Sequence, residues 1–240
     1  MLLRNRLLPT SWSDALFANL GGLTRAQLGL TRRMPSNAAT TICAVLLTAM
    51  ASTAMADEGW KKVSDQQGVK IERRSIQGSN FDELRASAQV SLPPAQFFDT
   101  VWNYRDFPQF VPYLKKLEVL AERDTTSDVY QRIAMPMVPD RDYVIRLHKG
   151  VDAERKIYEM NFESIEASAQ KPCESCIRAK SVQGGWRLEP TEDGQGTLVT
   201  YRMHSDPGGA LPSWVVNTLQ RNAPRDLVLA MIDRALGAKK

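Results

Sequence analysis

The sequence contains only two histidines and three cysteines among its 240 residues. Histidine is the commonest acid–base catalyst, and a structural zinc site needs four suitably spaced ligands. His148 and His204 have no partner motif, so we interpret both as hydrogen-bonding surface or corner residues. Nucleophile-elbow, Walker, Rossmann and zinc-protease motifs are also absent. The sequence therefore predicts no catalytic residue, no cofactor and no metal, which is the pattern of a protein that is not an enzyme.

A basic surface is missing as well. The formal net charge is +4, but residues 1–56 hold five arginines and only one acid, Asp14. Outside this segment, acidic and basic residues occur in equal numbers. Nucleic-acid-binding proteins carry lysine and arginine clustered on one face, so we expect no nucleic-acid partner.

No uninterrupted apolar run approaches the roughly 20 residues that a membrane-spanning helix needs. The most apolar stretch, residues 38–51, is broken by three threonines and is followed by Ser52. It lies between Arg32-Arg33 and the small residues Ala54-Met55-Ala56. A basic region, a short apolar region and an A-x-A site together form a secretory signal. We therefore predict a signal-peptide leader over residues 1–56.

Cleavage near Ala56 would release a mature domain, residues 57–240, that is periplasmic or secreted. A membrane-anchored protein is the less favoured alternative. Because 33 residues form an unusually long region before Met34, this methionine is a candidate for the true start.

The cysteines suit an oxidising compartment. Cys43 lies in the predicted signal and would leave with it. Cys173 and Cys176 could close a disulfide loop of four residues, which loop entropy makes worth only about 2 kcal/mol. The alternative is a pair of free thiols. In either form the pair would act on one turn and not on the whole fold.

Hydrophobic patterning in the mature domain is mostly that of strands. Leu84, Ala86, Ala88 and Val90 alternate with polar or charged residues, as in a strand with one buried face. Short polar turns separate the later strands, so consecutive strands must be antiparallel. The predicted strands cover residues 68–76, 81–92, 115–123, 128–137, 141–150, 155–166, 177–190 and 196–205.

Helical patterns occur at two places. Pro93-Pro94 begins a predicted helix over residues 93–104, and a short helical or irregular link follows over 105–114. The second helix covers Ser213–Leu236 and is interrupted by Pro224. A single long helix across a curved antiparallel sheet would bury the concave face of the sheet, as layer packing requires. The predicted fold class is therefore α+β.

A stiff corner, HSDPGGALPSWVVN, connects the last strand to this helix. Its prolines fix φ, while Gly208 and Gly209 permit backbone angles that other residues resist. Trp214 and Val215 then begin the helix face that we expect against the sheet. The corner is either the hinge of a lid or an anchor.

Five segments, taken in order and spacing, resemble one protein family. They are EGWKKVSDQQGVKIERR at 58–74, MPMVPDRDYV at 135–144, GGWRLEP at 184–190, TLVTYRMHSDPGGALPSWVVN at 197–217 and the late Pro224. The sequence resembles the START (StAR-related lipid-transfer) domain family, within the Bet v 1-like helix-grip (SRPBCC) superfamily. It departs from the pattern in having MPM where relatives often carry an aromatic residue, and in its Cys-x-x-Cys insertion.

The resemblance implies a curved sheet that grips the C-terminal helix around a hydrophobic tunnel. It implies non-catalytic binding, and shuttling, of a lipid or other apolar small molecule, with transient contact to a membrane surface. One alternative is a cyclase- or hydrolase-type enzyme of the same superfamily, for which Arg141, Tyr143, Tyr158 and Tyr201 are candidates. Another is an interaction module whose groove receives a partner segment.

The predicted cavity residues combine adaptable methionines, amphipathic aromatics and aliphatic side chains. Arg141 begins a strand whose alternation puts it on one face with Tyr143, Ile145 and Leu147. It could meet a polar head group there, or it could tie down the start of the strand together with Asp142. The full set is Met135, Met137, Arg141, Tyr143, Ile145, Trp186, Tyr201, Met203, Trp214, Val215 and Leu219.

Overall fold

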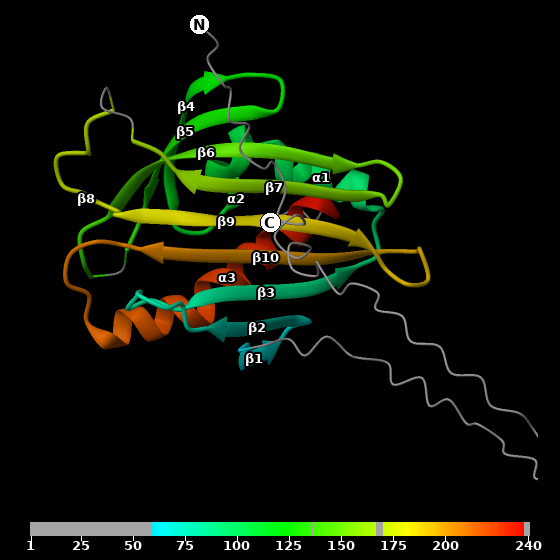
Figure 1. Ribbon diagram of the computed structural model, residues 1–240, viewed down its shortest axis with the longest axis horizontal. Helices are drawn as coiled ribbons and strands as arrows, with labels where there is room; N and C mark the ends of the chain where they lie inside the picture. Colours follow the sequence, from blue (N-terminus) through cyan, green and yellow to red (C-terminus); the bar gives the residue numbers. More distant parts are fainter. Residues whose placement is uncertain (1–58, 136, 167–169, 238–240) are drawn as a thin grey trace, which may run out of the picture. The chain divides into compact units, whose positions relative to one another are not determined.

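The computed structural model describes residues 59–237, apart from 136 and 167–169 (Figure 1). The predicted leader, its cleavage site and Cys43 lie outside the described residues, as do the side chains of residues 213 and 217–220 in the last helix. Among the described helices, none combines the length and the hydropathy needed to cross a bilayer.

Ten strands form one sheet in the order β1-β2-β3-β10-β9-β7-β6-β5-β4, with every neighbouring pair antiparallel, and the short β8 pairs in parallel with β6 (Figure 1). The antiparallel arrangement predicted from the short turns is confirmed. The strands are β1 Lys61–Gln66, β2 Val69–Arg74, β3 Glu83–Val90, β4 Leu114–Glu122, β5 Thr126–Ile133, β6 Arg141–Asp152, β7 Ile157–Ser164, β8 Ile177–Arg178, β9 Ser181–Pro190 and β10 Thr197–Asp206.

The strands differ from the predicted ones in three places. The sequence pattern did not predict β1, whose side chains are mostly exposed and do not alternate. The prediction that a strand reaches residue 137 is wrong, because β5 ends at Ile133 and Met137 has a φ of 62° that no strand residue adopts. The predicted strand over 177–190 is two strands, because β8 ends before Ser181.

The helices pack against the sheet. The first is α1 Pro94–Trp102, which begins at a proline as predicted, and η2 Tyr104–Asp106 and α2 Phe107–Phe110 make the short link. The long helix is α3 Ser213–Ala235, and it packs against β2, β3 and α1. This combination of an antiparallel sheet with a long C-terminal helix confirms the α+β helix-grip class.

The predicted interruption of the last helix at Pro224 is wrong. The helix α3 continues through this residue. A proline removes one backbone hydrogen bond and usually kinks a helix. Here Val228 and Met231, in the turns that follow, are fully buried in the core. The burial of these residues fixes the second half of the helix against the core.

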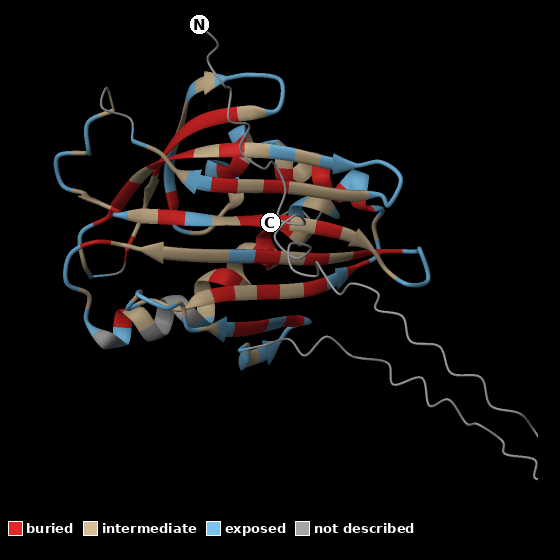
Figure 2. Ribbon diagram, in the orientation of Figure 1, coloured by how far each residue is buried: buried red, intermediate tan, exposed pale blue. Residues whose placement is uncertain are grey.

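Buried residues follow the alternation that the sequence predicts (Figure 2). On β3, Leu84, Ala86, Ala88 and Val90 are all buried, and the residues between them are more exposed. Phe97 and Val101 of α1 complete this part of the core with no exposed surface. The core therefore occupies the space between one face of the sheet and the helices.

Candidate ligand cavity

A largely apolar cavity of about 250 Å³ lies between the sheet and α3. Side chains from seven strands and from the first two thirds of α3 form its walls, and the segment around α2 closes one side. Its main apolar residues are Leu84, Phe107, Val111, Ile133, Met135, Ile145, Leu147, Met160, Phe162, Val182, Trp186, Met203, Val216 and Leu227.

The β6 face predicted to point inward does line this cavity. Arg141, Tyr143, Ile145 and Leu147 are all wall residues, as strand alternation requires. Met135 also reaches the wall from the loop after β5. The remaining predicted residues that line it are Trp186, Tyr201 and Met203. Contact of these residues with a ligand stays a prediction.

Three of the predicted cavity residues do not line the cavity, and the side chain of a fourth lies outside the described residues. Met137 is 89% exposed, because the backbone turns at this residue and carries its side chain away from the walls. Trp214 is 48% exposed at the start of α3. Val215 is buried but does not line the cavity, which Val216 does instead. The side chain of Leu219 lies outside the described residues.

Sequence reasoning missed several wall residues that belong to the same strand faces. Gln131 and Ile133 line the cavity from β5, beside Tyr143 and Arg141 of β6 in the register. Strand geometry puts Gln131 and Ile133 on one face, but the polar Gln131 gives no apolar signal in the sequence. Tyr104, Phe107 and Val111 come from η2, from α2 and from the residue after it, which are too short for a periodicity that predicts the direction of a side chain.

Arg141 joins the two loops at one end of the cavity. Its side chain is almost fully buried, and its guanidinium donates from Nε to Pro207 O at 3.2 Å and from Nη2 to Gly208 O at 3.2 Å. It also donates from Nη1 to Pro139 O. Among the described residues no carboxylate pairs with Arg141, and burial lowers its pKa. These contacts support the role in which Arg141 ties down the start of β6.

Residues 207–209 of the corner contact Asp206, Arg141 and Arg178. Gly208 and Gly209 have φ values of 67° and 63°, which strongly favour glycine. Gly208 N donates to Asp206 Oδ1 at 2.9 Å, and its Cα faces the backbone of Arg178 so closely that an added Cβ would lie 2.9 Å from the Arg178 carbonyl oxygen. The chain at this point is held from several directions.

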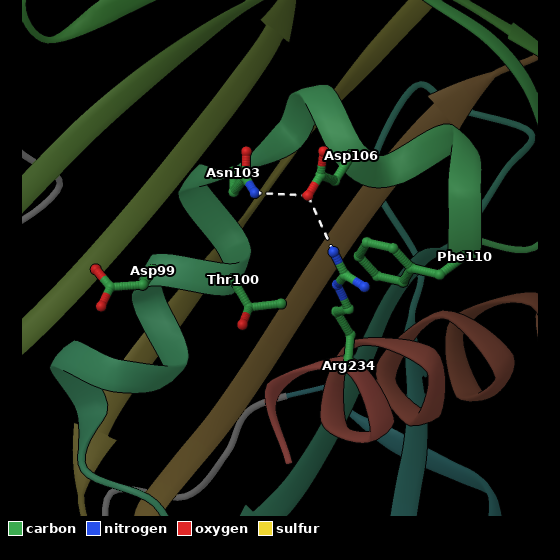
Figure 3. Close-up of a pocket in the computed structure, with 6 residues that line it drawn as sticks. All are labelled: Asp99, Thr100, Asn103, Asp106, Phe110 and Arg234. Atoms are coloured by element: carbon green, nitrogen blue, oxygen red, sulfur yellow. Dashed lines mark hydrogen bonds and ion pairs between the residues drawn. The ribbon is translucent and has the colours of Figure 1, made fainter. Parts of the chain in front are cut away.

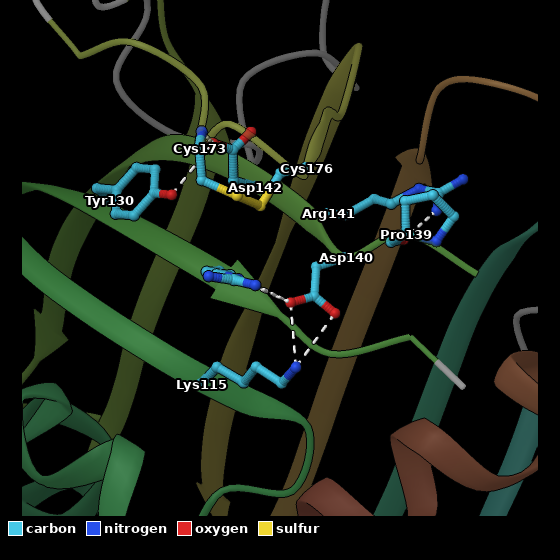
Figure 4. Close-up of polar contacts among 9 residues, drawn as sticks. Lys115, Tyr130, Pro139, Asp140, Arg141, Asp142, Cys173 and Cys176 are labelled. Carbon is cyan, nitrogen blue, oxygen red and sulfur yellow. Dashed lines mark hydrogen bonds and ion pairs between the residues drawn. A yellow bond between two sulfur atoms is a disulfide. The ribbon is translucent and has the colours of Figure 1, made fainter. Parts of the chain in front are cut away.

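Asp142, the neighbour of Arg141, points to the other side of β6 (Figure 4). There it binds the segment that contains Cys173 and Cys176, called the cysteine segment below. Its carboxylate is fully buried and accepts hydrogen bonds from Arg178 Nε at 2.8 Å, Cys173 N at 2.8 Å and Tyr130 Oη at 3.1 Å. Burial alone would raise the pKa of Asp142, but these hydrogen bonds and the charge of Arg178 outweigh burial and hold it below its usual value.

Cys173 and Cys176 form a disulfide with a Cα–Cα distance of 5.1 Å. The sulfur atoms lie near the Asp142 carboxylate, but its oxygens already accept the hydrogen bonds just described. In this arrangement the three residues form a structural tie between β6 and the segment that leads to β8.

A second, polar crevice of about 220 Å³ lies between α1 and the end of α3 (Figure 3). Arg234 Nη2 donates to Asp106 Oδ2 at 3.0 Å and stacks over the ring of Phe110, with 5.4 Å between Cζ and the ring centroid. Asn103 Nδ2 donates to the same carboxylate at 2.8 Å. These partners are engaged with one another, so the crevice is a contact between helices.

Neither histidine lines the cavity. His148 Nε2 lies 3.6 Å from Glu163 Oε1, and His204 Nε2 lies 2.9 Å from Ser79 Oγ. Tyr158, a candidate for catalysis, is also absent from the walls and packs against Phe98. Of the four polar candidates, only Arg141, Tyr143 and Tyr201 meet at the cavity.

The fold is that of a helix-grip protein, with a largely apolar cavity between the sheet and α3. Residues 44–224 match the START domain, and the chain belongs to this family. An uncharacterised protein of Pseudomonas aeruginosa is 27% identical over 187 residues, covering 77% of this chain and 90% of that protein. The phosphatidylcholine transfer protein of Mus musculus is 26% identical over 183 residues, covering 75% of this chain and 85% of its own length.

Solved structures share the fold. A STAR-related lipid transfer protein from Xanthomonas axonopodis superposes with a TM-score of 0.67 at 24% identity, covering 75% of this chain and 99% of that one. Human StAR-related lipid transfer protein 5 gives a TM-score of 0.65 at 19% identity, with coverages of 75% and 88%.

Proposed function

We propose that this protein binds a lipid, or another hydrophobic small molecule, in the cavity between the sheet and α3, and carries it without chemical change. The observation that carries the proposal is the apolar wall contributed by facing strands and by α3 around an internal space. The similarity to proteins named for lipid transfer supports the same function.

The energetics of burial favour such a role. Each buried methylene contributes roughly 0.8 kcal/mol, so a sixteen-carbon chain contributes about 12 kcal/mol before the costs of association. A carrier needs a gain of this order to draw a ligand from a membrane. The cavity is slightly smaller than the roughly 300–1,000 Å³ of typical small-molecule sites. This conformation therefore favours one chain or one compact ring system, and a two-chain lipid would require the walls to move.

A carrier is favoured over a cyclase or hydrolase by the state of the polar residues. General acid–base catalysis requires a group free to exchange a proton near the substrate. The guanidinium of Arg141 is committed to backbone carbonyls. Burial raises the pKa of both Tyr143 and Tyr201 well above the ordinary value, so neither phenol is poised to act as a base near neutral pH.

The compartment that we propose is the periplasm or the exterior, with transient contact to a membrane surface. The leader over residues 1–56 supports export. The disulfide between Cys173 and Cys176 is chemically suited to an oxidising compartment.

Binding is tested with the delipidated protein and a panel of fluorescent fatty acids and sterols. We expect saturable binding near one ligand per chain. Met203→Trp and Val216→Trp each fill the cavity, so affinity should fall by roughly tenfold or more, equivalent to about 1.4 kcal/mol.

Val151→Trp is the matched control, because Val151 is 52% exposed on β6 and does not line the cavity. Its affinity should equal that of the wild type, and circular dichroism should show that all three variants fold. Absence of saturable binding across the panel, or equal affinity for the cavity and control variants, contradicts the proposal.

A further inference from the structure

The disulfide between Cys173 and Cys176 closes a single turn. The two cysteines are three positions apart, and Cys176 N donates to Cys173 O at 3.0 Å within the turn. A cross-link over so few residues constrains the chain only locally. The sulfur–sulfur bond can therefore break and form again while the antiparallel strands of the sheet stay paired.

The turn is also open to a reactant. Cys173 and Cys176 are both partly exposed, and Glu174 and Ser175 between them are exposed. Thiol–disulfide exchange requires a thiolate to approach one sulfur atom, so access decides which disulfides react. This disulfide meets that requirement, in contrast to one enclosed in a core.

The chain leads from this turn straight to the cavity. Ile177 follows Cys176, and its N–H donates to Asp140 O at 2.9 Å. Two positions later, Ala179 N donates to Asp142 O at 2.9 Å, and Ala179 lines the cavity. The segment between the disulfide and the wall is thus three residues long.

Ile177 also packs against the corner that precedes α3. A Cβ added at Gly208 would lie 3.3 Å from Ile177 Cγ2, and a Cβ added at Gly209 would lie 3.1 Å from Ile177 Cδ1. Pro207 and Leu211, on either side of these glycines, line the cavity. The position of Ile177 therefore affects the same end of the cavity from a second direction.

We propose that Cys173 and Cys176 form a thiol–disulfide exchange site for a dithiol reductant, and that their reduction speeds ligand entry and release at this end of the cavity. The effect on the ligand rests on the proposed function. Reduction removes the constraint on the turn, so Ile177 gains freedom to move and its contact with the corner weakens.

The chemistry balances within the protein and one dithiol. A thiolate of the dithiol attacks one sulfur atom, the sulfur–sulfur bond breaks, and the other cysteine leaves as a thiolate. The second thiolate of the dithiol then attacks the mixed disulfide and releases the remaining cysteine. Two electrons pass from the dithiol, which becomes a disulfide, to the protein. The two protons that the dithiol loses end on Cys173 and Cys176.

The site itself is tested without a ligand. The full-length exported protein is incubated with dithiothreitol in native buffer and then with iodoacetamide, and peptide mass spectrometry should locate labels at both Cys173 and Cys176. Amide hydrogen exchange of residues 176–179 should become roughly tenfold faster on reduction, while exchange in β3 stays the same. Reduction that occurs only in urea, or exchange that does not change, overturns the proposal.

The effect on the cavity is measured by stopped-flow release of cis-parinaric acid, whose fluorescence rises in an apolar site. Release should be roughly three- to tenfold faster from the reduced protein. The double variant Cys173→Ser with Cys176→Ser should release at this faster rate with or without dithiothreitol. Glu174→Gln is the matched control, because it changes the same turn but keeps the disulfide and should respond as the wild type does.

Ile177→Ala tests the contact that connects the turn to the corner. This variant keeps the disulfide but loses the methyl groups that face Gly208 and Gly209. It should release cis-parinaric acid faster even when oxidised, and reduction should add less than twofold. A full response to dithiothreitol in Ile177→Ala overturns the role given to this contact.

The outcomes separate this proposal from the proposed function. Equal release rates from the oxidised and reduced wild type overturn the redox control of the cavity while the carrier function stands. If cis-parinaric acid does not bind, and neither does any ligand of the panel, the proposed function fails, whereas labelling and hydrogen exchange still decide whether the disulfide is an exchange site. Circular dichroism establishes that each variant is folded, and the reduced wild type replaces the double variant if that variant does not fold.

Discussion

At the scale of single residues, consecutive positions on β6 serve opposite faces of the sheet. Arg141 lines the cavity and binds the loop carbonyls, whereas Asp142 binds Arg178 and the cysteine segment. This division follows from strand geometry, in which successive side chains point to opposite faces. The motif Arg-Asp-Tyr therefore contributes a loop contact, a buried ion pair and a cavity wall in three successive residues.

Asp142→Asn should destabilise the protein by roughly 2–4 kcal/mol at pH 7, because Arg178 and Cys173 N would lose a charged acceptor in a buried site. The folded-state pKa of Asp142 is depressed, so its contribution is fully present above the unfolded value near 3.9 and is lost as pH falls through the folded value. The difference between variant and wild type should therefore shrink below about pH 4.

Urea unfolding at pH 7 and at pH 3 measures both effects. Asp152→Asn is the control, since Asp152 is exposed and its ion pair with Arg155 should be worth less than about 0.5 kcal/mol. A loss for Asp142→Asn that is as small as that of the control, or that does not change with pH, contradicts the expected role.

At the scale of elements, β9 depends on a close approach to its neighbour β10. A Cβ added at Gly184 would lie 2.1 Å from the backbone oxygen of Arg202 and 2.9 Å from the Phe162 ring. Gly184→Ala should therefore destabilise by roughly 3 kcal/mol or more, because backbone must shift to admit one methyl group.

Gly150→Ala provides the comparison within the same sheet. An added Cβ there would lie 3.5 Å from Glu159 Cβ, an ordinary contact, and the stability should change by less than about 1 kcal/mol. Chemical denaturation of both variants measures the difference. Equal stabilities would show that β9 and β10 separate easily at Gly184.

The elements also show how far sequence reasoning extends. Alternation predicted the inward faces of β3 and β6 because successive side chains of a strand point to opposite faces, although Asp142 and Val144 on the other face of β6 are buried as well. It could not distinguish core from cavity, since both are apolar. Met137 and Trp214 illustrate this limit: hydrophobicity favoured a buried place, but the turn at Met137 and the orientation of the first turn of α3 expose both side chains. Those directions depend on tertiary contacts between loops.

At the scale of the whole molecule, the cavity leaves part of the interior without packing partners. A ligand that fills it binds the folded state and not the unfolded chain, so stability and affinity are linked. At a free ligand concentration 100 times Kd, stabilisation should reach about 2.7 kcal/mol. For a domain of this size we expect Tm to rise by roughly 5–10 °C.

Differential scanning calorimetry with increasing ligand measures this shift. The cavity variant Met203→Trp should have the opposite pattern, with a Tm that hardly responds to ligand because its indole already occupies the space. A ligand-dependent Tm of equal size in Met203→Trp would place the binding site elsewhere on the protein.

The contacts of Arg141 have one consequence for behaviour in acid. Carbonyl oxygens do not titrate in the pH range of folded proteins, and a guanidinium keeps its charge throughout it. The clasp between Arg141, Pro139, Pro207 and Gly208 therefore works equally at neutral and acidic pH, whereas the tie at Asp142 weakens on protonation. Acidification should therefore loosen the segment around Cys173 and Cys176 first, while the contacts of Arg141 near the start of α3 remain. One face of β6 then responds to pH and the other does not.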